Sequence, residues 1–332
     1  MNILINSYCN LQCPYCFAKD AMNELHSCKD MSYEDFKTAI KYCKIFGIQQ
    51  LRLIGGEPSL SNNFIPFIDL GVKDPFFNEI IIFSNLTFSK EICDKIVELS
   101  QLKQISILPN INEFQLVGKT NKKKILYNLE NLINCGVITT LGINIYTPQM
   151  DLTNWFDLIL HYKLKNFRYS IATPTNIAQS DNFNFYEYYH SFQDKIVELA
   201  EFACKNHVKV STDCANVPIC CFNDKTITKV VTYTGCDMLG NKQCSFPVID
   251  IDPDLTVRGC FGSNFGSQAK LTDFDTFEDL RNYIVAANSE QLQNNIARKE
   301  CLECLRYKET GVSCGCLSSH KIDKRTLLKG GK

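Results

Sequence analysis

Runs of apolar, mostly β-branched residues alternate with amphipathic stretches through the first two thirds of the chain. The helical spacing of apolar residues predicts helices near residues 89–100, 121–135 and 186–206. The apolar runs predict buried strands at residues 2–6, 49–55, 79–85, 103–108, 139–146 and 166–172. Alternating strands and helices imply parallel strands with right-handed crossovers, hence an α/β barrel or an open doubly wound sheet. Six strand–helix units favour a partial β/α barrel, open on one side.

The segment between the first two expected strands shows the helical pattern clearly. In MSYEDFKTAIKYCKIFG, residues 31–47, one helical face is apolar. Ser32 and Asp35 can form a capping box at the start, and Gly47 can end the helix. We therefore expect a well-delimited helix here.

The pattern changes after about residue 207. Strand–helix alternation gives way to cysteine-rich loops and to helical patterns across about 276–299. A hairpin is expected in FPVIDIDPDLTVRGC, with its turn at residues 252–254. We divide the chain into a partial barrel, residues 1–207, and a small cysteine-rich domain, residues 208–332.

Composition narrows the possible partners and the compartment. The chain has 332 residues and a net charge of -1, so no global basic field favours nucleic acid or an anionic membrane. The opening MNILIN lacks the features of a secretory signal, and no apolar run approaches a bilayer span. We expect a cytoplasmic protein. In the reducing cytosol its 18 cysteines predict metal ligands rather than disulfides.

Three cysteines, Cys9, Cys13 and Cys16, crowd into the loop after the first expected strand. Thiolates are the standard ligands of iron–sulfur clusters, and a four-iron cluster held by only three of them keeps one iron open to an external ligand. Zinc is the alternative. Structural zinc normally takes four ligands, however, and the nearest histidine, His26, is ten residues from Cys16.

The spacing C-x3-C-x2-C, with the aromatic Tyr15 before the third cysteine, resembles the signature of the radical S-adenosylmethionine (SAM) superfamily. A second motif supports the resemblance. The turn after the second strand resembles the family motif whose backbone hydrogen-bonds the α-amino group of SAM while the methionine part chelates the open iron. Its glycines let the backbone approach a ligand closely. The turn consists of Gly55, Gly56, Glu57 and Pro58.

The resemblance also implies direct SAM contacts from three polar residues near strand ends. Ser84, Asn85 and Asn144 would contact the methionine, carboxylate or ribose. The alternative is that they are ordinary polar residues at strand ends. The family usually has glycine after Ser-Asn, where this chain has Leu86.

The C-terminal cysteines resemble the auxiliary-cluster module called SPASM, or its shorter relative called twitch. The family has glycine five residues before the hairpin cysteine, where this chain has Leu255. The resemblance implies two auxiliary four-iron clusters; a single twitch-type cluster or a zinc ribbon in CLEC…CGC are the alternatives. One cluster would take Cys236, Cys244, Cys260 and Cys316, and the other Cys301, Cys304, Cys314 and either Cys220 or Cys221.

Membership of this family would imply an enzyme with a 4Fe-4S cluster and SAM as cofactors. One electron from a flavodoxin- or ferredoxin-type reductant would cleave SAM, and the 5′-deoxyadenosyl radical would abstract a hydrogen from the substrate. SPASM proteins often crosslink, epimerise or oxidise a residue of a ribosomal peptide, and we expect a peptide substrate. A dehydrogenase or epimerase of a small molecule is the alternative. A non-catalytic electron carrier is another, but it would have no use for GGEP.

The adjacent Cys220 and Cys221 are also candidate catalytic residues. In an extended segment their side chains point to opposite faces. One thiol could then bind a cluster while the other returns a hydrogen atom to a substrate radical. Because the motif begins at Cys9, we expect that a leader peptide would be bound directly or by a separate protein.

Overall fold

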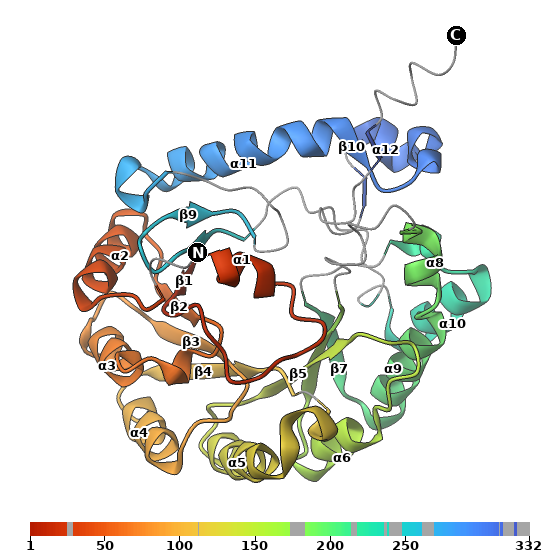
Figure 1. The fold of residues 1–332 in the computed structure, drawn as a ribbon. Coiled ribbons are helices and arrows are strands. Elements are labelled where there is room, and N and C mark those ends of the chain that lie inside the picture. The colour runs from red at the N-terminus through yellow and green to blue at the C-terminus, as the bar shows by residue number, and fades with distance from the viewer. Residues whose placement is uncertain are drawn as a thin grey trace. The chain divides into compact units, whose positions relative to one another are not determined.

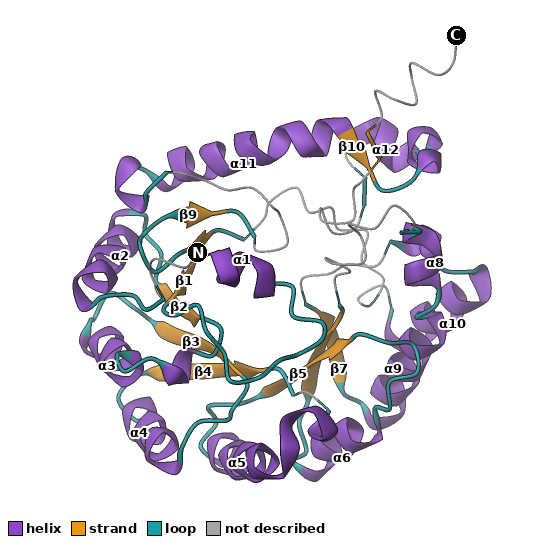
Figure 2. Ribbon diagram, viewed as in Figure 1, coloured by secondary structure: helices purple, strands orange, loops and turns teal. Residues whose placement is uncertain are grey.

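The computed structural model describes residues 1–24, 29–111, 113–172, 183–213, 218–235, 238, 248–260, 269–311, 313–314 and 322–323. Strands and helices alternate along the first part of the chain (Figures 1 and 2). Cys236, Cys244 and Cys316 lie outside the described residues, so nothing follows for the cluster assigned to them.

All six expected strands are present, which confirms the α/β class. They are β1 (Asn2–Leu4), β2 (Gln50–Ile54), β3 (Glu79–Ser84), β4 (Gln104–Pro109), β5 (Thr140–Ile145) and β6 (Asn166–Ile171). The helices that separate them are α1 (Lys19–Glu24), α2 (Tyr33–Ile45), α3 (Phe64–Lys73), α4 (Lys90–Ser100), α5 (Phe114–Asn134) and α6 (Thr153–His161).

Helix α2 begins and ends as its sequence predicts. The Ser32 side chain accepts a hydrogen bond from the Asp35 backbone N–H at 3.0 Å. Gly47 has a φ of +69°, a left-handed conformation that glycine adopts without steric cost. The next residue, Ile48, donates its N–H to the carbonyl of Cys43 at 2.8 Å, which closes the helix end.

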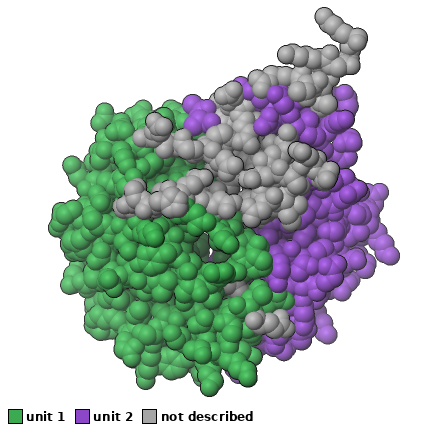
Figure 3. Space-filling view, viewed as in Figure 1, with its two compact units in different colours: residues 1–142, 248–261, 265–284 green, residues 143–247, 262–264, 285–332 purple. Residues whose placement is uncertain are grey.

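Residues 1–142, 248–261 and 265–284 form one compact unit (Figure 3, green). Its sheet has the strand order β4-β3-β2-β1-β8-β9, and strands β1 to β4 are parallel. Their carboxyl ends therefore lie at one edge of the sheet. Leu53 of β2 and Ile82 of β3 are register partners with 0% exposure. On the helices, Phe36 stacks on Phe67 with ring centroids 3.9 Å apart.

The expected hairpin exists, and it extends this same sheet. Its strands β8 (Asp250–Ile251) and β9 (Val257–Arg258) are antiparallel. Strand β8 also pairs in parallel with β1, with Asn2 opposite Asp250. Sequence pattern alone shows a hairpin but not its lateral partner, because that pairing joins segments almost 250 residues apart.

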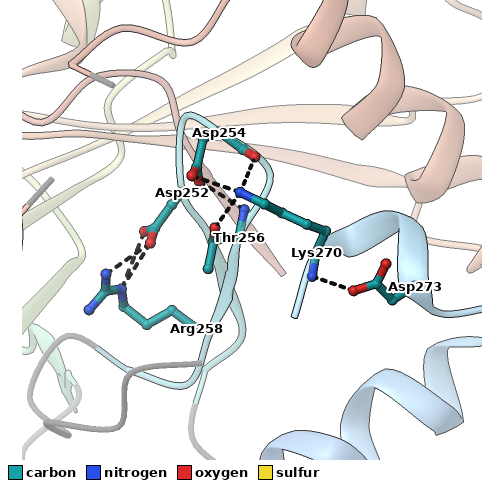
Figure 4. A network of polar contacts seen from close by, with 6 residues as sticks. All are labelled: Asp252, Asp254, Thr256, Arg258, Lys270 and Asp273. Atoms are coloured by element: carbon teal, nitrogen blue, oxygen red, sulfur yellow. Dashed lines mark hydrogen bonds and ion pairs between the residues drawn. The ribbon is translucent and has the colours of Figure 1, made fainter. Parts of the chain in front are cut away.

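Two ion pairs fix the turn of this hairpin (Figure 4). Arg258 donates to the buried carboxylate of Asp252, with Nη2 2.9 Å from Oδ2. Lys270 Nζ lies 2.7 Å from Asp254 Oδ2 and 2.8 Å from Thr256 Oγ1. The downstream elements η3 (Leu271–Asp273) and the start of α11 (Phe277–Asn294) belong to the same unit.

Residues 143–247, 262–264 and 285–332 form the second compact unit (Figure 3, purple). A three-stranded sheet orders β5-β6-β7, in which β7 (Lys209–Thr212) is parallel to β6. The unit also contains α8 (Phe185–His190), α9 (Gln193–Asn206), η2 (Ile219–Cys221) and α10 (Asp224–Thr234). Farther along lie β10 (Asn295–Ile296), η4 (Lys299–Glu303), α12 (Leu305–Thr310) and β11 (Ile322–Asp323).

Strand–helix alternation thus continues past residue 207, through β7 and α10. The short strand KVST was missed because only Val210 in it is buried. The two compact units divide the chain at points other than residue 207. The boundary at residue 207, between a module that binds SAM and a module that binds auxiliary clusters, stays a prediction. None of the described helices has the length and apolar composition that a membrane crossing requires.

Candidate functional site

The cysteine loop follows β1 at the carboxyl edge of the first sheet. Cys9 is exposed, and Cys13 and Cys16 are partly buried, as is Tyr15. A turn joins two of the cysteines, because Cys16 donates its N–H to the carbonyl of Cys13 at 3.2 Å. The Leu11 N–H lies 3.4 Å from the Cys9 sulfur, directed toward it. One loop of eight residues therefore presents all three thiols.

The GGEP turn after β2 packs directly on this loop. A Cβ on Gly56 would lie 2.2 Å from the carbonyl oxygen of Tyr8 and 2.9 Å from the nitrogen of Cys9. A Cβ on Gly55 would lie 2.1 Å from Asn6 Oδ1. The backbone bonds agree, since Glu57 N–H donates to Tyr8 O at 2.9 Å. In this structure the two glycines therefore permit close packing of the turn on the cysteine loop.

The carboxylate of Glu57 fastens the turn to the end of β3. It is 0% exposed, and Oε1 accepts from the hydroxyls of Ser59 at 2.6 Å and Ser84 at 2.8 Å. Oε2 accepts from the Asn85 backbone N–H at 2.7 Å. Burial raises the pKa of Glu57, while these hydrogen bonds act in the opposite direction. Pro58 begins the short helix η1 (Pro58–Leu60), which continues the turn.

The Glu57 carboxylate thus joins the GGEP turn to two further residues of the predicted SAM site, Ser84 and Asn85. The predicted contact of Ser84 and Asn85 with SAM stays a prediction. Asn144, on β5, belongs to the second unit, where its side-chain oxygen accepts a hydrogen bond from the Ser170 hydroxyl. Its contact with SAM also stays a prediction.

Leucine occupies a left-handed conformation at both positions where the family has glycine. Leu86 has a φ of +61° and Leu255 a φ of +67°. Both side chains are buried, at 0% and 8% exposure. The Leu86 carbonyl also accepts from Asn128 Nδ2 at 2.9 Å. Burial of an apolar side chain offsets the strain of about 1–2 kcal/mol that a left-handed residue carries. The chain thus keeps the backbone turn that glycine would form.

The second unit brings together some of the C-terminal thiols. Cys220 and Cys221 lie in the short helix η2, which corrects the expectation of an extended segment. Cys220 is exposed and Cys221 is buried, so they still differ in access. A hydrogen bond from the Cys221 thiol and the nearby Arg298 hold the pKa of Cys220 below its ordinary value. Conversely, the pKa of Cys221 is raised.

Arg298 organises the surroundings of these thiols. It lies 5.0 Å from the centre of the Tyr186 ring and donates to Glu300 at 2.8 Å. It also interacts electrostatically with Cys301, whose pKa is raised by burial. Cys301 in turn interacts electrostatically with Cys220. Cys301 is thus close enough to Cys220 for the two thiols to interact electrostatically, and their predicted place on one cluster stays a prediction.

The other predicted ligands are less well connected. Cys304 is exposed at the end of η4, and Cys314 is partly buried. Cys260 belongs to the first unit, at the end of the β8–β9 hairpin, where its N–H donates to Val248 O at 3.2 Å. Within the described ranges, no three His, Cys, Asp or Glu side chains lie close enough to hold a metal ion. The individual ligand assignments stay predictions.

Sequence reasoning missed Asn10, Thr87 and Arg298. Asn10 and Thr87 belong to different strand ends, and only the parallel register of β1 to β3 brings them within 2.8 Å. Arg298 stands three residues before Cys301, and this proximity to a cysteine pair was a usable signal. The N-terminal residues themselves fit a thiolate-held cluster, because three thiols share one loop and two N–H groups are directed at the Cys9 sulfur.

Relatives of known function match part of the chain. The GTP 3',8-cyclase of Clostridium perfringens (strain 13 / Type A) is 30% identical over 145 residues, which are 41% of this chain and 43% of that enzyme. A probable GTP 3',8-cyclase of Methanococcus maripaludis is 29% identical over 163 residues, 48% of this chain and 52% of that protein. The chain spans about half the length of these relatives, or less.

Solved structures resemble the chain over more of its length. AnSMEcpe with bound AdoMet superposes with a TM-score of 0.64 and 16% identity, over 97% of this chain and 91% of that one. SuiB from Streptococcus suis, bound to the precursor peptide SuiA, superposes with a TM-score of 0.61 and 13% identity, over 91% of this chain and 68% of that one. At these identities the likeness shows a shared fold.

The family match covers the N-terminal part of the chain, including both sequence motifs. The family model described as the Radical SAM superfamily matches residues 3–215, which contain the three-cysteine loop and the GGEP turn. This match, the parallel α/β fold and the fold shared with an AdoMet-bound structure agree with one another. The chain is therefore an enzyme that uses a 4Fe-4S cluster and SAM, and it belongs to the radical SAM superfamily.

Proposed function

We propose that this enzyme modifies a residue of a peptide by hydrogen abstraction, leading to a crosslink, an epimerised residue or an oxidised one. The observation that supports a peptide substrate best is the fold likeness to SuiB bound to its precursor peptide SuiA, over 91% of this chain. The curated cyclases match less than half of the chain, so they support a shared part of the fold more than a shared substrate.

In this proposal Cys9, Cys13 and Cys16 hold the cluster that binds SAM. When bound, the cluster and SAM supply the radical chemistry. The chain holds the cysteine loop and the GGEP turn in fixed relation through the close packing at Gly56 and the bond from the Glu57 N–H to Tyr8 O. Ser84 anchors that turn by its bond to the Glu57 carboxylate. Such rigidity matters because the reacting groups of an active site must be held within about 0.5 Å of their productive geometry.

The cysteines of the second unit would hold one or two auxiliary clusters. Cys301 with Cys220 forms the most defined part of such a site, beside Arg298. Cys220 is the better ligand candidate because it is exposed, whereas the buried Cys221 stays protonated and can act as a hydrogen-atom donor. The reductant would be a flavodoxin- or ferredoxin-type protein, and a separate protein could present the leader of the peptide.

A small-molecule substrate is the second candidate. The 30% identity to GTP 3',8-cyclase over 145 residues favours it, since that enzyme's name specifies a nucleotide. The alternative of a non-catalytic electron carrier falls away with family membership.

Incubation of the anaerobically reconstituted enzyme with SAM and a reductant tests the two substrates directly. Short peptides encoded beside the gene would be supplied in one set of reactions and GTP in another. We expect a peptide whose mass changes in proportion to the 5′-deoxyadenosine formed, and unchanged GTP. Consumption of GTP with no peptide product would contradict the peptide proposal. A variant with Cys9, Cys13 and Cys16 replaced by alanine serves as the inactive control.

A further inference from the structure

The side chain of Asn85 uses its whole hydrogen-bonding capacity inside the protein. Its Nδ2 lies 3.1 Å from Asn10 Oδ1 and 3.7 Å from the sulfur of Cys9. Its Oδ1 accepts from the backbone N–H of Thr87 at 3.0 Å and from the Thr87 hydroxyl at 2.6 Å. An amide has two N–H donors and an oxygen with two lone pairs, so all four positions are occupied.

The hydrogen-bond partners of the Asn85 amide determine which of its two atoms is the oxygen and which the nitrogen. A backbone N–H can only donate, so the atom of Asn85 that faces the Thr87 N–H must be the oxygen. The nitrogen must therefore face Cys9 and Asn10. The hydrogen bond to the sulfur follows from this arrangement rather than from an arbitrary choice of amide rotamer.

The residues around Asn85 are themselves held firmly. The Asn85 backbone N–H donates to the buried carboxylate of Glu57 at 2.7 Å. Thr87 is 3% exposed, and its hydroxyl accepts from Asn10 Nδ2 at 2.8 Å. Asn10 follows Cys9 directly in the chain. The end of β3 thus contacts the cysteine loop both at the sulfur of Cys9 and at the next residue.

We propose that Asn85 is a positioning residue for Cys9. The Asn85 amide holds the Cys9 sulfur in place and donates a hydrogen bond to this sulfur when Cys9 ligates the SAM-binding cluster. This inference rests on the proposed assignment of Cys9 as a ligand. A hydrogen bond to a cluster sulfur stabilises the reduced, more negative state and thereby raises the reduction potential. The amide therefore makes the cluster easier to reduce.

The midpoint potential of the holoenzyme cluster, followed by electron paramagnetic resonance, tests this. The relevant signal is the one that changes when SAM is added. In Asn85→Asp the N–H donors are lost, and we expect the ratio of reduced to oxidised cluster at fixed poise to fall by about tenfold, equivalent to about 59 mV for one electron. Thr87→Val removes only the hydroxyl that steadies the amide, and should shift the potential the same way by less.

Asn131→Asp is the matched control, because it makes the same change on α5, at a partly exposed residue whose Nδ2 donates to Tyr127 O at 2.7 Å. It should leave the potential unchanged. Iron content separates the two claims: Cys9→Ala should lose the SAM-responsive signal, and its retention would overturn the ligand assignment. Wild-type potentials in both Asn85→Asp and Thr87→Val, at full iron content, would overturn the positioning role. If Asn85→Asp cannot retain the cluster, an unchanged potential in Thr87→Val alone overturns it.

Discussion

The two cysteine-bearing regions of this enzyme are built in different ways. In the first unit three thiols share one short loop, which is packed on the GGEP turn by glycines and tied to β3 through Glu57 and Asn85. In the second unit the thiols come from η2 and η4, about 80 residues apart in sequence, and they interact electrostatically with one another and with Arg298. The first region is thus defined by local sequence and dense backbone packing, and the second by long-range side-chain proximity. Substitutions in the first should therefore act through packing, and those in the second through individual ligands.

Gly56→Ala should have the largest effect in the first region. Its Cβ would meet backbone atoms of Tyr8 and Cys9, which cannot rotate away. We expect a loss of about 3 kcal/mol in unfolding free energy and loss of SAM binding, measured by denaturant unfolding and equilibrium dialysis. Gly47→Ala is the control, since nothing lies near its Cβ and only its positive φ is strained. Wild-type SAM affinity in Gly56→Ala would show that this packing does not matter.

Glu57→Gln tests the link between the GGEP turn and β3. The substitution places an NH2 group against donors that now face a carboxylate oxygen. Loss of such charged hydrogen bonds costs about 2–3 kcal/mol. We expect this loss in thermal unfolding, together with weaker SAM binding. The exposed Glu98→Gln, whose partner is Lys95, should change neither quantity. Equal stability and equal SAM binding in the two variants would show that Glu57 does not link the GGEP turn to β3 in a way that matters.

The same contrast explains how much the sequence could predict. Cys9, Cys13, Cys16 and GGEP are recognisable because each motif is contiguous, and the alternating apolar pattern predicts β1 to β6. The pairing of β8 with β1 joins distant segments, and no local pattern encodes it. The grouping of Cys301 with Cys220 or Cys221 comes from the family resemblance and not from a local pattern. The strand β7 was missed because it is short and only partly buried.

The division between the two regions does not follow the order of the chain, because the hairpin that carries Asp250 and ends at Cys260 pairs with the first sheet. Burial raises the pKa of Asp250 to about 7, against a hydrogen bond from Asn2. A carboxyl whose pKa is higher in the folded state stabilises the fold at low pH and less as pH rises. Stability should fall by about 1.4 kcal/mol per pH unit between about pH 4 and 7 from this group.

Asp250→Asn should remove this part of the pH dependence while it preserves an oxygen for Asn2. The variant should therefore be more stable than the wild type at pH 8, as measured by urea unfolding at several pH values. If the unfolding free energy of the variant varied with pH between 5 and 7 as steeply as that of the wild type, Asp250 would not titrate in this range.

The smallest predicted effect concerns Leu86, next to the Ser84–Asn85 pair. Glycine usually destabilises relative to alanine by about 0.5–1 kcal/mol. At a φ of +61° the order should reverse, with Leu86→Gly more stable than Leu86→Ala by about 1 kcal/mol, although both lose the buried side chain. Leu255, at +67°, should behave alike. The usual order at both positions would show that the strain is relieved in solution.

Iron content and 5′-deoxyadenosine formation, measured together on two sets of variants, test the central claim that the two regions hold separate clusters. The reconstituted enzyme should contain about twelve irons per chain, because three four-iron clusters are expected. Replacing Cys9, Cys13 and Cys16 by alanine should leave about eight irons and abolish SAM cleavage. Replacing Cys301 and Cys304 should also leave about eight irons but preserve the cleavage of SAM. SAM cleavage by the first variant at the wild-type rate would contradict the account.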